Sequence, residues 1–356
     1  MPANGDVYSG KEFSTYICED VTGVGTFNTA NGSTWKTLDI ESFSFPSFNP
    51  TQEFEMRTGT GRVAQHGSMF TSDKGVTREI QISGRLTADA LLILAENVLG
   101  VDSGGVECVV SGTHSPATLE HYIASPTSGT TIDVGSYEKS LSMYFLSPIP
   151  AESIKMKGCV CTSFAITADM GTAAGRFDFT ATLQTGYAPA KGVITDFDPT
   201  AVSSVYYFLS DMGAKTITDN TSGFTQINPL ITTFGLNIAG SAQMLGMQGA
   251  NGDPEVIARQ VPELEITYNL GIKYDSTTAP LVDEYRQTDQ DIAFYIANVA
   301  ESGTTFDASA VKLGIDINKS VLTAVDFDSG DIASLNITAK VVAGATSAET
   351  FVLQVA

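Results

Sequence analysis

Basic residues are scarce in this chain of 356 residues, which carries 19 Lys and Arg against 40 Asp and Glu and a formal net charge of −21. Because tight binding to DNA requires cations that neutralise phosphates, this balance argues against a protein that grips DNA. Charged residues make up only 17% of the chain, below the usual share of about 25%. Such a surface, rich in small polar residues, suits repeated contacts between copies of one chain.

Histidine is nearly absent, with only His66, His114 and His121 in the chain. A hydrolytic triad needs a base and an oriented nucleophile, and the sequence has no G-x-S-x-G elbow. His114 and His121, taken with Cys108 and Glu120, fit no zinc spacing. The sequence therefore predicts a protein that is not an enzyme, without catalytic residues, a metal site or a cofactor.

Long apolar runs and paired cysteine motifs are also missing. The longest apolar run, residues 91–95, is far too short to span a membrane. The first residues lack the basic and apolar regions of a signal peptide. The four cysteines include no C-x-x-C pair, although Cys159 and Cys161 lie near Lys155 and Lys157, which would lower a thiol pKa. We expect synthesis in the cytoplasm, reduced thiols and no membrane partner.

Alternation of apolar and polar residues, which is typical of strands with one buried face, dominates the sequence. It is clearest over residues 37–45, 76–86, 176–183, 234–238, 265–272 and 334–341. The prediction is a mainly β protein.

Two short helices are predicted, each directly after a strand. The first covers residues 88–99, with Thr87 as its N-cap and Gly100 after its end. The second covers roughly residues 279–287, with Pro280 in its first turn and Thr277 or Thr278 as its cap.

An internal repeat links the two halves of the chain. The segment Phe177–Gly186 matches Leu335–Gly344, and every inward position is apolar in both copies. Upstream, residues 163–169 match 320–326 and residues 154–158 match 311–314. The repeat predicts two tandem β-sandwich or partial-barrel domains, each with a flanking helix. We call residues 1–190 the first half, 191–204 the linking segment and 205–356 the second half.

The order of these patterns resembles the tail tube, or major tail, proteins of tailed bacteriophages. The segments that carry the resemblance are Phe13–Ile17, Trp35–Ile40, the residues Arg57 and Arg62, Arg78–Leu86, Ala90–Gly100, Lys157–Val160, the turn at Met170 and Phe179–Leu183. It covers residues 10–187 directly and 205–345 through the repeat.

The resemblance implies rings in which neighbouring sheets join into a β-barrel lumen, stacked through a long loop between early strands. That loop is residues 46–75, with 239–261 as its counterpart. The implied stacking residues are Arg57, Arg62, His66 and Lys74. The second loop lacks a clear set of arginines, which departs from the pattern. Two domains per chain imply a homotrimeric, pseudo-hexameric ring.

The partners that the resemblance implies are copies of the chain, other tail proteins and genomic DNA, which passes through the lumen without tight binding. An acidic lumen repels phosphates, and Asp178 and Glu265 are candidates for it. The expected location is the virion, after assembly in the host cytoplasm. Two alternatives stay open: another ring protein of the tail tip or baseplate, or a β-sandwich carbohydrate or adhesion module, which clustered aromatic residues on loops would favour.

Overall fold

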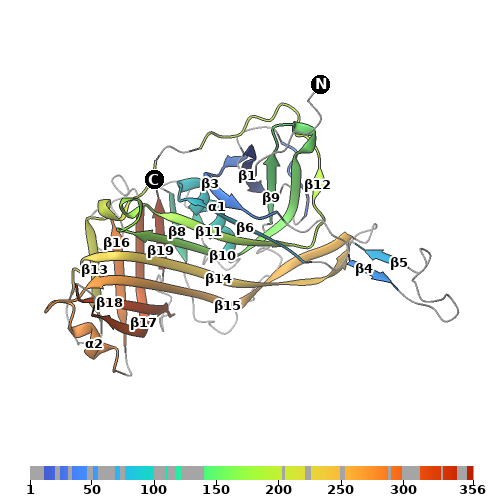
Figure 1. The fold of residues 1–356 in the computed structure, drawn as a ribbon. Helices are drawn as coiled ribbons and strands as arrows, with labels where there is room; N and C mark the ends of the chain where they lie inside the picture. Colours follow the sequence, from blue (N-terminus) through green and yellow to red (C-terminus); the bar gives the residue numbers. More distant parts are fainter. Residues whose placement is uncertain are drawn as a thin grey trace.

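A computed structural model of the chain is mainly β, as predicted (Figure 1). The structure describes residues 12–20, 25–30, 34–45, 51–54, 69–72, 77–99, 109–110, 117–121, 140–202, 205–220, 226–248, 253–287, 290–298, 313–329, 332–342 and 351–355.

One long antiparallel sheet runs through both halves. Its strands, in spatial order, are β3 (Ile40–Phe43), β6 (Arg78–Arg85), β11 (Asp178–Thr185), β10 (Ile154–Asp169), β14 (Ile231–Gln248), β15 (Asp253–Lys273), β18 (Ser334–Val341) and β17 (Leu313–Asp328). Their core-facing residues alternate with polar ones, and this alternation is the pattern that predicted most of these strands.

Each half adds a smaller back sheet. In the first half β2 (Lys36–Thr37), β1 (Ser14–Glu19) and β9 (Leu141–Leu146) join the beginning of β10, which also pairs with β12 (Ala190–Lys191). In the second half β13 (Ala214–Asp219) and β16 (Ile292–Ala297) join the beginning of β17, which also pairs with β19 (Phe351–Val355). The first half then crosses over, because β7 (Val109–Val110) and β8 (Ala117–His121) extend this sheet beyond β19.

The predicted first helix is confirmed as α1 (Ala88–Leu99). Thr87 caps it, since its Oγ1 accepts the backbone N–H of Ala90 at 3.3 Å. The second helix, α2 (Pro280–Glu284), is shorter than predicted and has no side-chain cap. The chain after it tightens into turns with i+3 bonds, such as Gln287 N–H to Glu284 C=O at 2.9 Å. Thr278, a predicted cap, instead donates its hydroxyl to the Lys273 carbonyl.

The two halves repeat one order of strand pairing. In the first, β1 pairs with β9, β9 with β10, β10 with β11, β11 with β6 and β6 with β3. In the second, β13, β16, β17, β18, β15 and β14 pair in the same order. Even the bulge between Met156 and Cys159 recurs between Ile317 and Ser320. This repetition supports the predicted duplication.

The strand registers correct two of the sequence alignments. Ile154 lies opposite Phe145, and its counterpart is Ile315 opposite Ile296, rather than residue 311. Ile166 faces Phe179, so its counterpart is Val325, which faces Ile337. A difference in bulge position contributes to the second error. The bulge opposite β11 lies between Cys161 and Ser163, whereas the bulge opposite β18 lies between Leu322 and Ala324, and a sequence alignment does not place such bulges.

The main core runs without a break through both halves, and α1 packs on it through Ala90, Leu91 and Leu94. Two separately closed domains are therefore not established, and the boundaries at 190 and 205 stay a prediction. The linking segment lies against the first half, where Ile194 and Phe197 pack on a second, small aromatic core.

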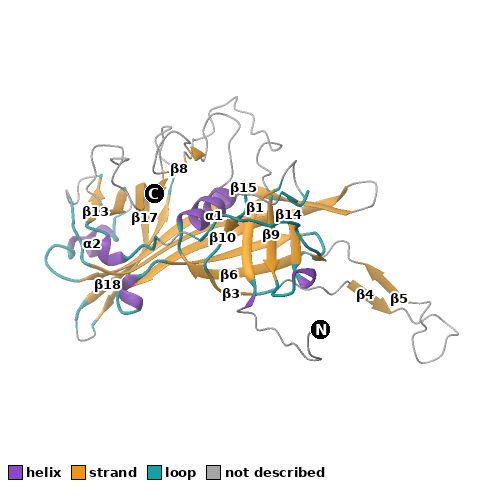
Figure 2. Ribbon diagram, turned by 90° about the horizontal axis from the view of Figure 1, so that it is seen from above, coloured by secondary structure: helices purple, strands orange, loops and turns teal. Residues whose placement is uncertain are grey.

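The two long loops expected to stack rings contain regular strands. β4 (Thr51–Phe54) pairs with β5 (Met69–Ser72) inside residues 46–75. Residues 239–261 belong to the long hairpin of β14 and β15, which stays paired from Ser241–Gln260 out to Gln248–Asp253. Both hairpins project at the same end of the molecule (Figures 1 and 2).

Candidate assembly interface

A seam between β10 and β14 joins the two halves within the chain. Seven residue pairs form it, from Ser163 opposite Ala239 to Asp169 opposite Thr233. Its central core-facing pair, Ile166 opposite Leu236, is fully buried or nearly so. Each half thus contributes four neighbouring strands to the long sheet. At the seam, the strand at the end of the first half's set, β10, pairs with the strand at the beginning of the second half's set, β14.

The counterpart of β10 in the second half, the end of β17, has one open side. It pairs with β18, but no described strand pairs with the other side of residues 324–327. Phe327 corresponds to Ala168 through the ladder positions of β18 and β11. Ala168 is 3% exposed because β14 covers it, whereas Phe327 is 56% exposed. The Phe327 ring packs edge-on against Tyr274, with centroids 5.1 Å apart, and otherwise faces outward on a strand edge of the kind that can pair with another chain.

The counterpart of β14 in the first half, β3, lies at the opposite end of the long sheet. It pairs with β6, and among the described residues no strand covers its other side. Ile40 and Phe43, which correspond to Phe234 and Leu236, are only half-buried. Phe45 beside them is 37% exposed. Among the described residues, both ends of the long sheet therefore present partly or mostly exposed apolar side chains on a strand edge that no other strand covers.

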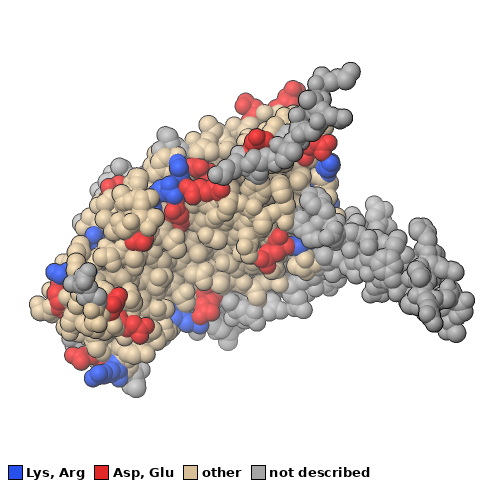
Figure 3. Space-filling model, in the orientation of Figure 1, with Lys and Arg blue, Asp and Glu red and all other residues tan. Residues whose placement is uncertain are grey.

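The two predicted lumen residues share the face of the long sheet that points away from the core. Asp178 lies on β11 and binds Arg176, with Nε to Oδ1 at 2.7 Å. Glu265 lies on β15 and pairs with Lys340 of β18 at 2.8 Å. Between them the face carries mostly threonine, serine and asparagine. Figure 3 likewise shows acidic and basic side chains in small groups on a largely uncharged surface. These carboxylates are thus locally neutralised.

The predicted stacking residues Arg57, Arg62, His66 and Lys74 lie outside the described residues. The strands that flank them, β4 and β5, form a separate two-stranded sheet. Their stacking role stays a prediction.

The environment of Cys159 opposes the activated thiol that the sequence suggested. Burial, with a smaller contribution from the charge of Asp20, raises the pKa of the Cys159 thiol well above its ordinary value, so the nearby lysines do not activate it. The described residues contain no group of three or more ligating side chains that could hold a metal ion. In the described part of the chain, no helix is long and apolar enough to cross a bilayer.

Comparison of the chain with protein-family models finds no match, and neither does comparison with curated proteins.

Proposed function

We propose that the chain is a structural protein of a phage tail tube, which closes rings by joining the open edge of β17 in one copy to the open edge of β3 in the next. The observation that carries the proposal is the β10–β14 seam, because the two open edges are the counterparts of its two strands. Such a contact is head-to-tail, and a head-to-tail contact forms a ring when its rotation closes.

The seam also supplies the register of the proposed contact. When each residue of the seam is replaced by its counterpart in β17 or β3, Val325 lies opposite Phe43, as Ile166 lies opposite Leu236 in the seam. Phe327 then lies opposite Ile40, as Ala168 lies opposite Phe234. Apolar cross-strand pairs of this kind each contribute about 0.2–1 kcal/mol beyond their backbone bonds. If every seam turns the sheet alike, three chains supply the six repeats of a pseudo-sixfold ring.

In such a ring the outer face of the long sheet, with Asp178 and Glu265, lines the lumen. Its polar side chains and paired charges offer phosphates few free cations, which suits DNA that passes without binding. The sequence resemblance favours a ring of the tail tube. A ring of the tail tip or baseplate could close through the same two strand edges.

Negative-stain microscopy of the purified protein tests ring formation. We expect rings, and at high concentration stacked tubes. Dispersed single chains at high concentration, over a range of salt concentrations, would contradict the proposal.

Phe327→Lys tests the edge itself, because a charge at this position opposes pairing with a second copy. We expect the variant to lose rings while its circular dichroism stays that of the parent, since Phe327 is mostly exposed. Val193→Lys is the matched control: Val193 is 46% exposed and lies in the linking segment. Rings in Phe327→Lys as abundant as in the control would refute the edge assignment.

A further inference from the structure

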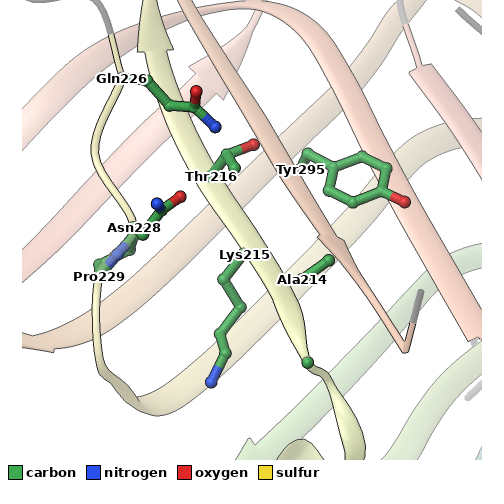
Figure 4. Close-up of a pocket in the computed structure, with 8 residues that line it drawn as sticks. Ala214, Lys215, Thr216, Gln226, Asn228, Pro229 and Tyr295 are labelled. Atoms are coloured by element: carbon green, nitrogen blue, oxygen red, sulfur yellow. The ribbon is translucent and has the colours of Figure 1, made fainter. Parts of the chain in front are cut away.

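A slot opens on the second half between β13 and the segment that follows it. The cavity has a volume of about 680 Å³ and is lined by Lys215, Thr216, Gln226, Asn228 and Tyr295, together with Gly213, Ala214 and Pro229. Figure 4 shows the segment with Gln226, Asn228 and Pro229 running beside β13, and Tyr295 on the strand at the other side of β13. A cavity of this size is in the range of about 300–1,000 Å³ for ligand sites.

The first half has an aromatic cluster at the corresponding place. Strand β1 pairs with β9 as β13 pairs with β16, so Tyr16 corresponds to Thr216 and Tyr144 to Tyr295. The bonded pair Ile17–Lys36 corresponds to Ile217–Ile227, which places Gln226 at the position of Trp35. Trp35 is completely buried, whereas Gln226 is exposed. Two large aromatic side chains are thus replaced by smaller polar ones.

A proline keeps the slot open. In the first half the Leu38 N–H donates to the Thr15 carbonyl at 3.1 Å and closes the edge of β1. The counterparts are Pro229, which has no N–H, and Lys215. Among the described residues β13 bonds to this segment only at Ile217 and Ile227, so the Lys215 carbonyl keeps an open side.

The linking segment shows what occupies this place in the first half. The Phe197 ring packs on Tyr16, Tyr144 and Trp35, with centroids 4.8, 5.1 and 5.8 Å away. Farther along, the Thr200 N–H donates to the Trp35 carbonyl at 3.0 Å, so the backbone runs parallel to β2. The three residues under Phe197 are the counterparts of three that line the slot.

We propose that the slot binds an extended peptide segment of a partner chain, with one aromatic side chain flanked by carboxylates. The aromatic ring lies over Thr216 and Tyr295, and a backbone N–H of the segment donates to the Gln226 carbonyl. Charge complementarity favours acidic flanks: Asp196 and Asp198 flank Phe197 in the first half, and Lys215 has no carboxylate partner among the described residues. This site does not depend on ring closure through β3 and β17.

A fluorescein-labelled peptide with the sequence of residues 192–202 is the probe, titrated with intact protein and followed by fluorescence anisotropy. We expect saturable binding, weakened at least about tenfold when the peptide carries Ala in place of Phe197. Thr216→Tyr combined with Gln226→Trp restores the first half's side chains, fills the slot and is expected to abolish binding. Lys215→Glu, a milder change at the strand edge, is expected to weaken binding several-fold and in a salt-dependent way.

Thr338→Tyr is the matched control, because Thr338 is an exposed strand residue on β18 away from the slot. It should bind the peptide like the parent. Peptide binding that survives in the double variant would mean exchange with the linking segment on the first half, and would overturn the proposal. The proposal would also be overturned if the parent protein did not bind the peptide, or if it bound maltotriose saturably instead of the peptide.

Discussion

The two halves share a pairing frame but differ in what covers it. The back sheet of the first half is closed by Trp35, Tyr16, Tyr144 and the linking segment, whereas the same surface of the second half is a polar slot. The long sheet shows the same asymmetry, since the end of β10 is covered by β14, while among the described residues one side of the corresponding end of β17 pairs with no strand. The second half has the same strands as the first but lacks the residues that cover them there. This difference suggests that other chains supply the missing contacts.

Truncating the aromatic cluster of the first half should give the largest difference in stability between the two halves. Trp35→Ala removes a fully buried ring that contacts Phe27, Tyr144 and Phe197. We expect a loss of about 3–5 kcal/mol in the free energy of unfolding, measured by urea denaturation. Its counterpart Gln226→Ala is exposed and should change stability by less than about 0.5 kcal/mol. Equal losses at the two positions would show that the second half is covered as the first is.

A half-buried carboxylate, that of Asp20, gives the next largest difference. Asp20 accepts hydrogen bonds from the hydroxyls of Ser140 and Ser142 and from the N–H groups of Gly25 and Gly158. Asp20→Ala leaves these donors without their acceptor, and we expect a loss of about 2–3 kcal/mol in unfolding free energy.

Asn220 is the matched position in the second half. Its N–H bonds to the Asp291 carbonyl as the N–H of Asp20 bonds to that of Ser140. Among the described residues its side chain makes one long hydrogen bond, from Nδ2 to Asp291 Oδ1 at 3.4 Å. Asn220→Ala should therefore cost under about 1 kcal/mol. A larger loss of unfolding free energy at Asn220 than at Asp20 would contradict the claim that Asp20 makes the more important hydrogen bonds.

The smallest expected effect is a pH dependence located in the second half. Burial, and then the charge of Asp219, raises the pKa of Glu284 on α2 above its ordinary value. Its Oε1 has no hydrogen-bond partner in the described part of the chain, and Oε2 accepts from Gln287 Nε2 at 2.8 Å. Because the folded pKa is the raised one, ionisation of Glu284 opposes folding, and stability falls as pH rises from the unfolded pKa through the folded pKa.

Glu284→Gln removes this titration. We expect the variant to gain stability relative to the parent at pH 7 and to show little difference at pH 4, measured by urea midpoints at the two values. Glu152, which is exposed and pairs with Lys191, supplies the control variant Glu152→Gln. A midpoint difference that stays constant with pH would contradict the raised pKa.

The sequence predicted those parts of the fold that are encoded locally. The strands with one buried face and the capped helix α1 follow from a period of two and from Thr87. β1 and β9 were missed because both their faces are buried, so their apolar runs do not alternate. The hairpin of β14 and β15 was read as a loop where it leaves the core.

The interface and the slot depend on long-range pairing, which one sequence does not reveal. The open edges of β3 and β17 become visible only once β10 is known to pair with β14. The slot required the correspondence of Gln226 with Trp35 and of Pro229 with Leu38. One local signal was present: Tyr144 and Tyr295 stand in similar apolar segments, and aligning these would have exposed the missing aromatic residues.

A disulfide across the proposed contact tests the central claim most directly. Val325 and Phe43 lie at opposite ends of the long sheet within one chain, so a bond between cysteines at these positions forms between copies. Facing residues of antiparallel strands have Cα atoms about 4.5–5.5 Å apart, which is within disulfide range. For Val325→Cys with Phe43→Cys, non-reducing gels should show a linked ladder that ends at the trimer, and each single variant should stay monomeric. Absence of the linked species, or faster linking of Val325→Cys with Ser44→Cys, would contradict the register taken from the β10–β14 seam.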